Sequence, residues 1–234
     1  MKLTNSVALV TGGSSGIGRA IAETLIASGA KVAITGRNSI RLEEAAKAIG
    51  AFPIQADVSK ESDAIGTVER TIEHFGQLDI LVNNAGIGVF KDLADLDLAD
   101  FESVFATNVT GAMLMGREAT KHFIKRNSGN IINIASTAGL RGAPGGTAYY
   151  ASKFALRGMT ECWRAELRKH NIRVMLVNPS EVVTGFFATA GIPQKVNESK
   201  LRGEEIAHAV KAMLEMDDRG FTTELTIFAT NPHD

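Results

Sequence analysis

Residues 7–18 read Val7-Ala8-Leu9-Val10-Thr11-Gly12-Gly13-Ser14-Ser15-Gly16-Ile17-Gly18. A short apolar run, which predicts a buried strand, leads directly into a glycine-rich turn and then into a helical pattern. Such a turn lets the backbone approach a phosphate closely, and the free N–H groups at the start of the helix attract negative charge. Gly12, Gly16 and Gly18 meet these requirements. The stretch therefore predicts a nucleotide phosphate at this turn.

Two other interpretations of the glycine turn are possible. An ordinary connection between a strand and a helix also carries glycine, so the pattern alone is weak evidence. Its place after the first strand, near the beginning of the chain, favours nucleotide binding. A P-loop would need Lys and then Ser or Thr after its last glycine, but Arg19-Ala20 follows Gly18. Nucleotide hydrolysis is therefore disfavoured.

Strand-like and helix-like patterns alternate along the whole chain. Apolar runs that predict strands lie at 7–10, 32–35, 52–55, 80–82, 131–134, 174–177 and 225–228. Helical patterns lie at 18–27, 41–49, 64–75, 101–123, 151–169 and 204–216. Several strand runs lack polar alternation, as expected of parallel strands buried on both faces. We expect an α/β fold, a Rossmann-type doubly wound parallel sheet of about seven strands with helices on both faces.

Length and composition narrow the class of protein. The 234 residues suit one α/β domain spanning 1–234, and 44% hydrophobic with 22% charged residues is typical of globular chains. A formal net charge of -1 makes nucleic acid and anionic membranes unlikely partners. A lone cysteine and scattered histidines predict no metal site. With no apolar run long enough for a membrane helix, we expect a soluble, cytoplasmic protein.

The end of the second predicted strand bears on the choice of cofactor. It reads Thr35-Gly36-Arg37-Asn38, without the acidic residue that usually binds the ribose hydroxyls of NAD. Arg37 can pair with a 2′-phosphate and stack on adenine. Taken alone, it could equally be a solvated loop arginine. With the missing acid, the sequence favours NADP(H) over NAD(H).

Ser136, Tyr149 and Lys153 form the strongest catalytic signal. Ser136 follows an apolar strand, and Tyr149 and Lys153 are four apart near the start of a helix. That spacing offsets them by only ~40° with a rise of about 6 Å, so both side chains face the same way. Tyr150 also shares a helix face with Lys153, so geometry alone does not reject it as the acid/base.

These residue types suit hydride transfer to a carbonyl, which needs a proton at the carbonyl oxygen. A free phenol has a pKa of about 10, and a neighbouring ammonium can lower that by roughly 1–3 units. Ser136 can donate a hydrogen bond to the substrate oxygen and stabilise its developing charge. We therefore expect Lys153 to lower the pKa of Tyr149. Singly, each residue also has a structural interpretation, as a helix-start aromatic, a surface charge or a strand-end cap.

Over nearly its whole length the chain resembles the short-chain dehydrogenase/reductase family, in particular 3-oxoacyl and carbonyl reductases. The matching motifs are Thr-Gly-x3-Gly-x-Gly ending at Gly18, Asp57-Val58, Asn83-Asn84-Ala85-Gly86, Asn108, Ser136, Tyr149-x3-Lys153, and Pro179 with Thr184. The resemblance implies an NAD(P)-dependent oxidoreductase that interconverts a carbonyl compound and an alcohol. It also implies a homodimer or a homotetramer.

The resemblance assigns a role to each motif. Tyr149 is the acid/base, because the family's spacing from Ser136 selects it over Tyr150. Ser136 polarises the carbonyl. Lys153 also holds the nicotinamide ribose, and Asn108 orders a water in the proton relay. A mid-helix Asn often only bonds its own backbone. The implied cofactor-binding residues are Gly12, Ser14, Ser15, Gly16, Ile17, Gly18, Arg37, Asp57, Val58, Asn83, Ala85, Gly86, Tyr149, Lys153, Pro179, Val182 and Thr184.

The chain departs from the family pattern twice. Pro179 is followed by Ser180 where relatives usually carry glycine, so local cofactor geometry is expected to differ. The final Asp-Gly-Gly signature of many members is absent, which puts the usual C-terminal subunit contact in doubt.

The substrate is expected to be a small or medium apolar carbonyl compound. Residues 184–200 lack a clear period and predict a lid over it, although Phe186 and Phe187 at its start could instead simply close the edge of the core. The expected pocket residues are Gly88, Phe90, Leu140, Ala143, Tyr150, Phe186, Phe187 and Ile192. The alternative function is a non-catalytic NADP(H)-binding redox sensor or scaffold, which would not need Ser136, Tyr149 and Lys153 together.

Overall fold

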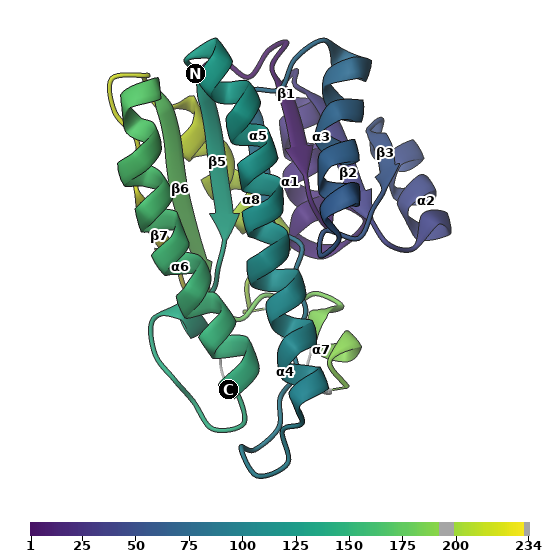
Figure 1. Cartoon of the computed structure of the whole chain (residues 1–234), viewed down its shortest axis with the longest axis vertical. Helices are drawn as coiled ribbons and strands as arrows, with labels where there is room; N and C mark the ends of the chain where they lie inside the picture. Colours follow the sequence, from purple (N-terminus) through teal and green to yellow (C-terminus); the bar gives the residue numbers. More distant parts are fainter. Residues whose placement is uncertain (192–198, 232–234) are drawn as a thin grey trace.

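The computed structural model describes residues 1–191 and 199–231. Within them, seven strands form one parallel sheet in the order β3-β2-β1-β4-β5-β6-β7 (Figure 1). The strands are β1 (Val7–Val10), β2 (Lys31–Gly36), β3 (Phe52–Gln55), β4 (Ile80–Asn83), β5 (Gly129–Ile134), β6 (Ile172–Pro179) and β7 (Glu224–Ile227). Every neighbouring pair is parallel. The predicted fold is confirmed.

Helices cover both faces of the sheet. On one face lie α1 (Gly16–Ala27), α2 (Ser39–Ile49) and α8 (Gly203–Glu215), whose buried side chains share one core cluster with β1 and β2. On the other lie α3 (Glu61–Phe75), α5 (Ala112–Arg126) and α6 (Thr147–Leu167), with a second cluster (Figure 1). All residues of β1, β4, β5 and β6 are buried, which explains why these strands are rich in Val, Ile and Leu and lack a regular polar alternation.

The predicted helix at 101–123 is in fact three segments. α4 (Leu98–Phe105) passes into a π-helical segment, η1 (Ala106–Gly111), before α5 begins. The wider turn lies where the side chain of Asn108 leaves the helix to bond the backbone of Ile87. A single π-helical segment is too short for apolar periodicity to reveal it.

Region 184–200 contains a short helix that the sequence did not predict, α7 (Phe186–Thr189). Another short segment, the 3₁₀ turn η2 (Thr137–Gly139), follows β5. Beyond α7, Leu201 forms a parallel bridge with Val182, and its carbonyl accepts a hydrogen bond of 2.7 Å from the amide of Val183. Ile192 lies outside the described residues. No helix in the described part of the chain is long and apolar enough to cross a membrane.

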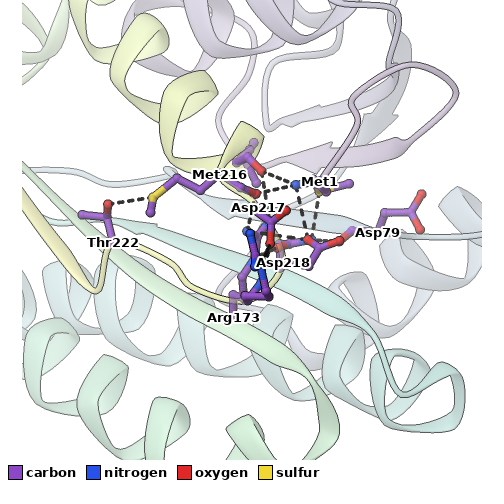
Figure 2. Close-up of polar contacts among 10 residues, drawn as sticks. Met1, Asp79, Arg173, Met216, Asp217, Asp218 and Thr222 are labelled. Atoms are coloured by element: carbon purple, nitrogen blue, oxygen red, sulfur yellow. Dashed lines mark hydrogen bonds and ion pairs between the residues drawn. The ribbon is translucent and has the colours of Figure 1, made fainter.

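The carboxyl end of α8 meets two cationic groups. The Met1 ammonium donates to the carbonyls of Leu214 and Met216 at 2.9 and 2.7 Å. The buried guanidinium of Arg173 in β6 donates to the same carbonyls at 3.0 and 3.2 Å (Figure 2). Positive charge stabilises the carbonyl end of a helix. These bonds tie α8 to β6, the strand that leads to the candidate site.

Candidate active site

A cavity of about 530 Å³ lies beyond the carboxyl ends of β1, β2 and β4, where open parallel sheets bind nucleotides. We call it the cofactor cavity. Its walls come from the glycine turn, the end of β2, the segment after β3 and the segment after β4. They include eleven of the expected cofactor residues: Gly12, Ser14, Ser15, Gly16, Ile17, Arg37, Asp57, Val58, Ala85, Gly86 and Thr184.

The glycine turn has the conformation that the motif requires. Gly12 and Gly16 have φ values of 65° and 53°, in the left-handed region that favours glycine. Gly18 does not line the cofactor cavity. A Cβ atom there would collide with the side chain of Asn84 and lie 2.5 Å from the Gly12 carbonyl oxygen. Gly18 therefore permits close packing of α1 against the turn.

Asn84 connects the glycine turn to the segment after β4. Its amide nitrogen Nδ2 donates to the carbonyls of Thr11 and Gly12 at 2.9 and 3.3 Å. Asn84 itself lines the cofactor cavity, whereas Asn83, the expected residue, does not. The Asn83 side chain points into the fold and donates to Asn133 at 2.9 Å. Asn83 is the last residue of β4 and Asn84 the first residue beyond it, and the two asparagines have different surroundings.

Two arginines lie at the end of the cofactor cavity near β2. Arg37 was expected there, and Arg41, in the first turn of α2, also lines the wall with Asn38. The Asn38 side chain accepts a hydrogen bond of 2.9 Å from the Arg41 amide and so fixes the start of this helix. Burial acts to raise the pKa of Asp57, but hydrogen bonds from Ser59 and the charge of Arg37 hold it below its ordinary value.

A second cavity, of about 500 Å³, lies beyond β5 and β6. We call it the substrate cavity. Thr184 and Phe186 line both cavities, so the two adjoin. The substrate cavity is lined by Phe90, Ala135, Ser136, Thr137, Ala138, Arg141, Tyr149, Tyr150, Pro179, Ser180, Glu181, Val182, Thr184, Phe186, Lys200, Phe228 and Ala229.

This lining differs from the expected apolar pocket. Phe90, Tyr150 and Phe186 line it as predicted, but Leu140 and Ala143 do not. Gly88 lines the cofactor cavity instead. The side chain of Phe187 lies outside the described part. The sequence patterns do not predict Phe228, which follows β7, or the three charged side chains Arg141, Glu181 and Lys200 in this lining. None of these residues belongs to a recognisable sequence motif.

Tyr149 lies among aromatic rings at this wall. Its ring centre is 5.4 Å from that of Phe90 and 5.3 Å from that of Phe186. Burial raises the pKa of Tyr149 to about 12, although a side-chain hydrogen bond with Ser136 acts to lower it. The Ser136 hydroxyl also accepts a bond of 3.1 Å from the Ala138 amide.

Lys153 is close to Tyr149 but does not lower its pKa. The Lys153 ammonium lies 5.6 Å from the centre of the Tyr149 ring and donates to the Ile134 carbonyl at 3.0 Å. Burial lowers the pKa of Lys153 to about 8. The expected lowering of the phenol pKa is therefore wrong for this structure, because burial is the largest cause of the shift and the Lys153 ammonium is not among its causes.

Asn108 holds the segment after β4 in place. Its side chain accepts from the Ile87 amide at 2.8 Å and donates to the Ile87 carbonyl and to Ser152, both at 2.9 Å. It is 1% exposed. A Cβ atom on Gly86 would lie 3.3 Å from Asn108 Oδ1 and 3.7 Å from Lys153 Nζ. Asn108, Gly86 and Lys153 are therefore neighbours; Gly86 lines the cofactor cavity, whereas Asn108 and Lys153 are buried behind it and line neither cavity.

Ser180 fits where relatives carry glycine. Among the described residues, the non-glycine positions with positive φ are Asn5, Asn127 and Asn171, so Ser180 needs no left-handed conformation. Its amide donates to the Ile227 carbonyl at 2.8 Å and extends the pairing of β6 with β7. Pro179 and Val182, two expected cofactor residues, line the substrate cavity with it.

Solved structures of two oxidoreductases share the fold of nearly the whole chain. A 3-ketoacyl-(acyl-carrier-protein) reductase from Brucella melitensis, complexed with NADH, superposes with a TM-score of 0.91 at 31% identity over 98% of this chain and 99% of that one. An alcohol dehydrogenase from Thermococcus sibiricus, complexed with 5-hydroxy-NADP, gives a TM-score of 0.89 at 28% identity over 98% of both chains.

Sequence comparison gives the same result. An uncharacterized oxidoreductase from Staphylococcus saprophyticus is 35% identical over 97% of this chain and 98% of its own length. The family model for short chain dehydrogenases matches residues 6–195, which include the glycine turn, Ser136, Tyr149 and Lys153. The protein therefore belongs to the short-chain dehydrogenase family and is an NAD(P)-dependent oxidoreductase of that family.

Proposed function

We propose that this enzyme transfers a hydride between NADP(H) and a carbonyl or alcohol substrate, with Tyr149 as the general acid and base. One observation carries the proposal. Tyr149 and Ser136 line the same substrate cavity, the Ser136 side chain acts on the pKa of Tyr149, and that cavity adjoins the cofactor cavity. A carbonyl oxygen that accepts hydrogen bonds from both hydroxyls is held where a proton can reach it.

The residues of the cofactor cavity fit a dinucleotide. Its left-handed glycines and the start of α1 suit a pyrophosphate, and Thr184 stands between the two cavities. When bound, the reduced nicotinamide supplies the hydride. Lys153 and Asn108 lie beside Gly86, at the boundary where the nicotinamide ribose would be held.

The charge state of Tyr149 suits carbonyl reduction. A phenol with a pKa of about 12 keeps its proton at neutral pH, and reduction requires a proton donor. Oxidation of the alcohol requires the phenolate. The positive charge of an oxidised nicotinamide would favour that form. Asn108 acts in this scheme as a positioning residue. It would also order a water in a proton relay that leads from Lys153 to the solvent.

The preference for NADP(H) rests on Arg37 and Arg41. Both line the β2 end of the cofactor cavity, and β2 ends without a carboxylate. Paired guanidinium groups suit a 2′-phosphate. The two structural neighbours carry NADH and 5-hydroxy-NADP, so the arginines of this chain are the stronger support.

Residues 184–191, the described first part of the lid expected at 184–200, would close over the substrate. Thr184 and Phe186 belong to this region and form the wall that the two cavities share. A change in their position would open or shut the path between cofactor and substrate. The ring of Phe186 against Tyr149 also keeps water from the phenol.

The experiment follows NADPH absorbance while the protein is incubated with a panel of activated ketones and aldehydes. We expect turnover that depends on both protein and carbonyl compound. A non-catalytic redox sensor or scaffold would bind NADPH, measured by fluorescence titration, but would oxidise none of it. That result across the whole panel would overturn the proposed function.

A further inference from the structure

Among the described residues, three charged side chains line the substrate cavity: Arg141, Glu181 and Lys200. Lys200 and Glu181 form an ion pair of 2.8 Å, and the Lys200 side chain is only 9% exposed. The carboxylate therefore already balances one of the two cations. Arg141 has no ion-pair partner within residues 1–191 and 199–231, so the wall keeps one uncompensated positive charge.

Arg141 is linked closely to the reacting group. It follows η2, the short turn that begins directly after Ser136, and the hydroxyl of Ser136 fixes this turn by accepting the Ala138 amide at 3.1 Å. The segment that polarises the substrate oxygen therefore also carries the guanidinium. The distance between the two is set by a few residues of ordered backbone.

We infer that the physiological substrate is an anionic carbonyl compound, an oxo carboxylate whose acid group pairs with Arg141 while its carbonyl accepts from Tyr149. The inference rests on the proposed function and deepens it. A guanidinium presents two parallel N–H donors that match the two oxygens of a carboxylate. Phe90, Phe186 and Phe228 provide apolar wall for the carbon chain between the two polar ends.

A neutral apolar substrate would use this cavity poorly. It would leave the exposed Arg141 guanidinium with only water as its partner and would gain nothing from its charge. The Glu181–Lys200 pair also adds polar surface that an apolar compound cannot satisfy. A carboxylate would instead pair directly with the charge of Arg141.

The test compares a homologous series of oxo carboxylates with their methyl esters, which share shape but lack the charge. The measured quantity is the ratio of kcat/KM for the acid to kcat/KM for the ester at each chain length, with saturating NADPH. For at least one length we expect the acid to be preferred by about tenfold to hundredfold, as for a charge-assisted hydrogen-bonded pair. The ratio should fall as ionic strength rises.

Variants assign the preference to one residue. Arg141→Met should bring the acid-to-ester ratio close to one, and Arg141→Lys should restore part of it, because the charge remains but the two-pronged geometry is lost. Arg70→Met is the matched control. Arg70 is an exposed arginine of α3 that lines neither cavity, and its replacement should leave the ratio as in the wild-type enzyme.

The outcomes separate this inference from the proposed function. Turnover of esters with no preference for any acid, or an acid preference that survives Arg141→Met, overturns the inference alone. If neither acids, esters nor the ketone panel oxidise NADPH, the proposed function fails and the inference fails with it. Loss of the preference in Arg141→Met, with the ratio unchanged in Arg70→Met, supports it.

Discussion

The ammonium of Lys153 lies 5.6 Å from the centre of the Tyr149 ring, and its hydrogen bond goes to the carbonyl of Ile134. The two groups are thus neighbours whose ionisation is governed mainly by burial. Burial raises the pKa of Tyr149 to about 12 and lowers that of Lys153 to about 8. In both residues burial shifts the pKa in the direction that disfavours the charged form, as expected when water is excluded from a site.

Removal of the phenol hydroxyl tests the acid/base role. We expect Tyr149→Phe to lower kcat by about a thousandfold, within the range for loss of a general acid, and to leave the NADPH dissociation constant nearly unchanged. Tyr150→Phe is the matched control, since Tyr150 lines the same cavity. Stopped-flow turnover and fluorescence titration measure the two quantities. If Tyr150→Phe abolished turnover instead, the assignment of Tyr149 would be wrong.

Lys153→Met should separate stability from activity. A buried ammonium disfavours the folded state while it is charged, so we expect the variant to unfold with a free energy about 1–3 kcal/mol higher at neutral pH, and to lose most activity. The burial penalty is fully present below the folded pKa of about 8 and disappears above the ordinary value of 10.5.

The wild-type protein should therefore gain stability relative to Lys153→Met as the pH rises between those values. Urea unfolding at a series of pH values measures the difference. A difference that stays constant from neutral pH to pH values above 10.5 would mean that Lys153 titrates like a solvated lysine.

Arg37→Ala combined with Arg41→Ala should weaken NADPH binding by about tenfold to hundredfold, because a 2′-phosphate loses charge-assisted hydrogen bonds. NADH binding should change by less than about threefold, since NADH lacks that phosphate. Fluorescence titration with both cofactors gives the two constants. An equal loss of affinity for NADPH and for NADH would show that the arginines do not contact a 2′-phosphate.

Gly88→Ala should disturb the aromatic wall. A Cβ atom there would lie 2.7 Å from Phe90 and 2.8 Å from Phe186, so both rings must move, and Phe186 packs on Tyr149. We expect kcat/KM to fall about tenfold or more, with the larger part in KM. The control is Gly158→Ala in α6, where nothing lies within 4 Å of the added atom. It should raise stability by ~0.5–1 kcal/mol and leave kinetics unchanged.

Local patterns in the sequence were sufficient to predict the architecture of the fold. The runs rich in Val, Ile and Leu in β1, β4, β5 and β6 identify strands covered on both faces, and the glycine turn after β1, whose left-handed glycines the structure contains, predicts a phosphate-binding loop. These features depend on neighbouring residues, which the sequence displays directly. The same is true of the four-residue spacing that places Tyr149 and Lys153 on one helix face.

The tertiary structure alone decided which distant segments meet at the edge of the sheet. Arg41, Arg141, Lys200 and Phe228 reach the cavities because α2, η2 and the ends of β6 and β7 converge there. It also decided the sign of the Tyr149 pKa shift, since burial depends on Phe90 and Phe186, which come from elsewhere in the chain. Spacing along a helix fixes direction, whereas exclusion of water requires the whole fold.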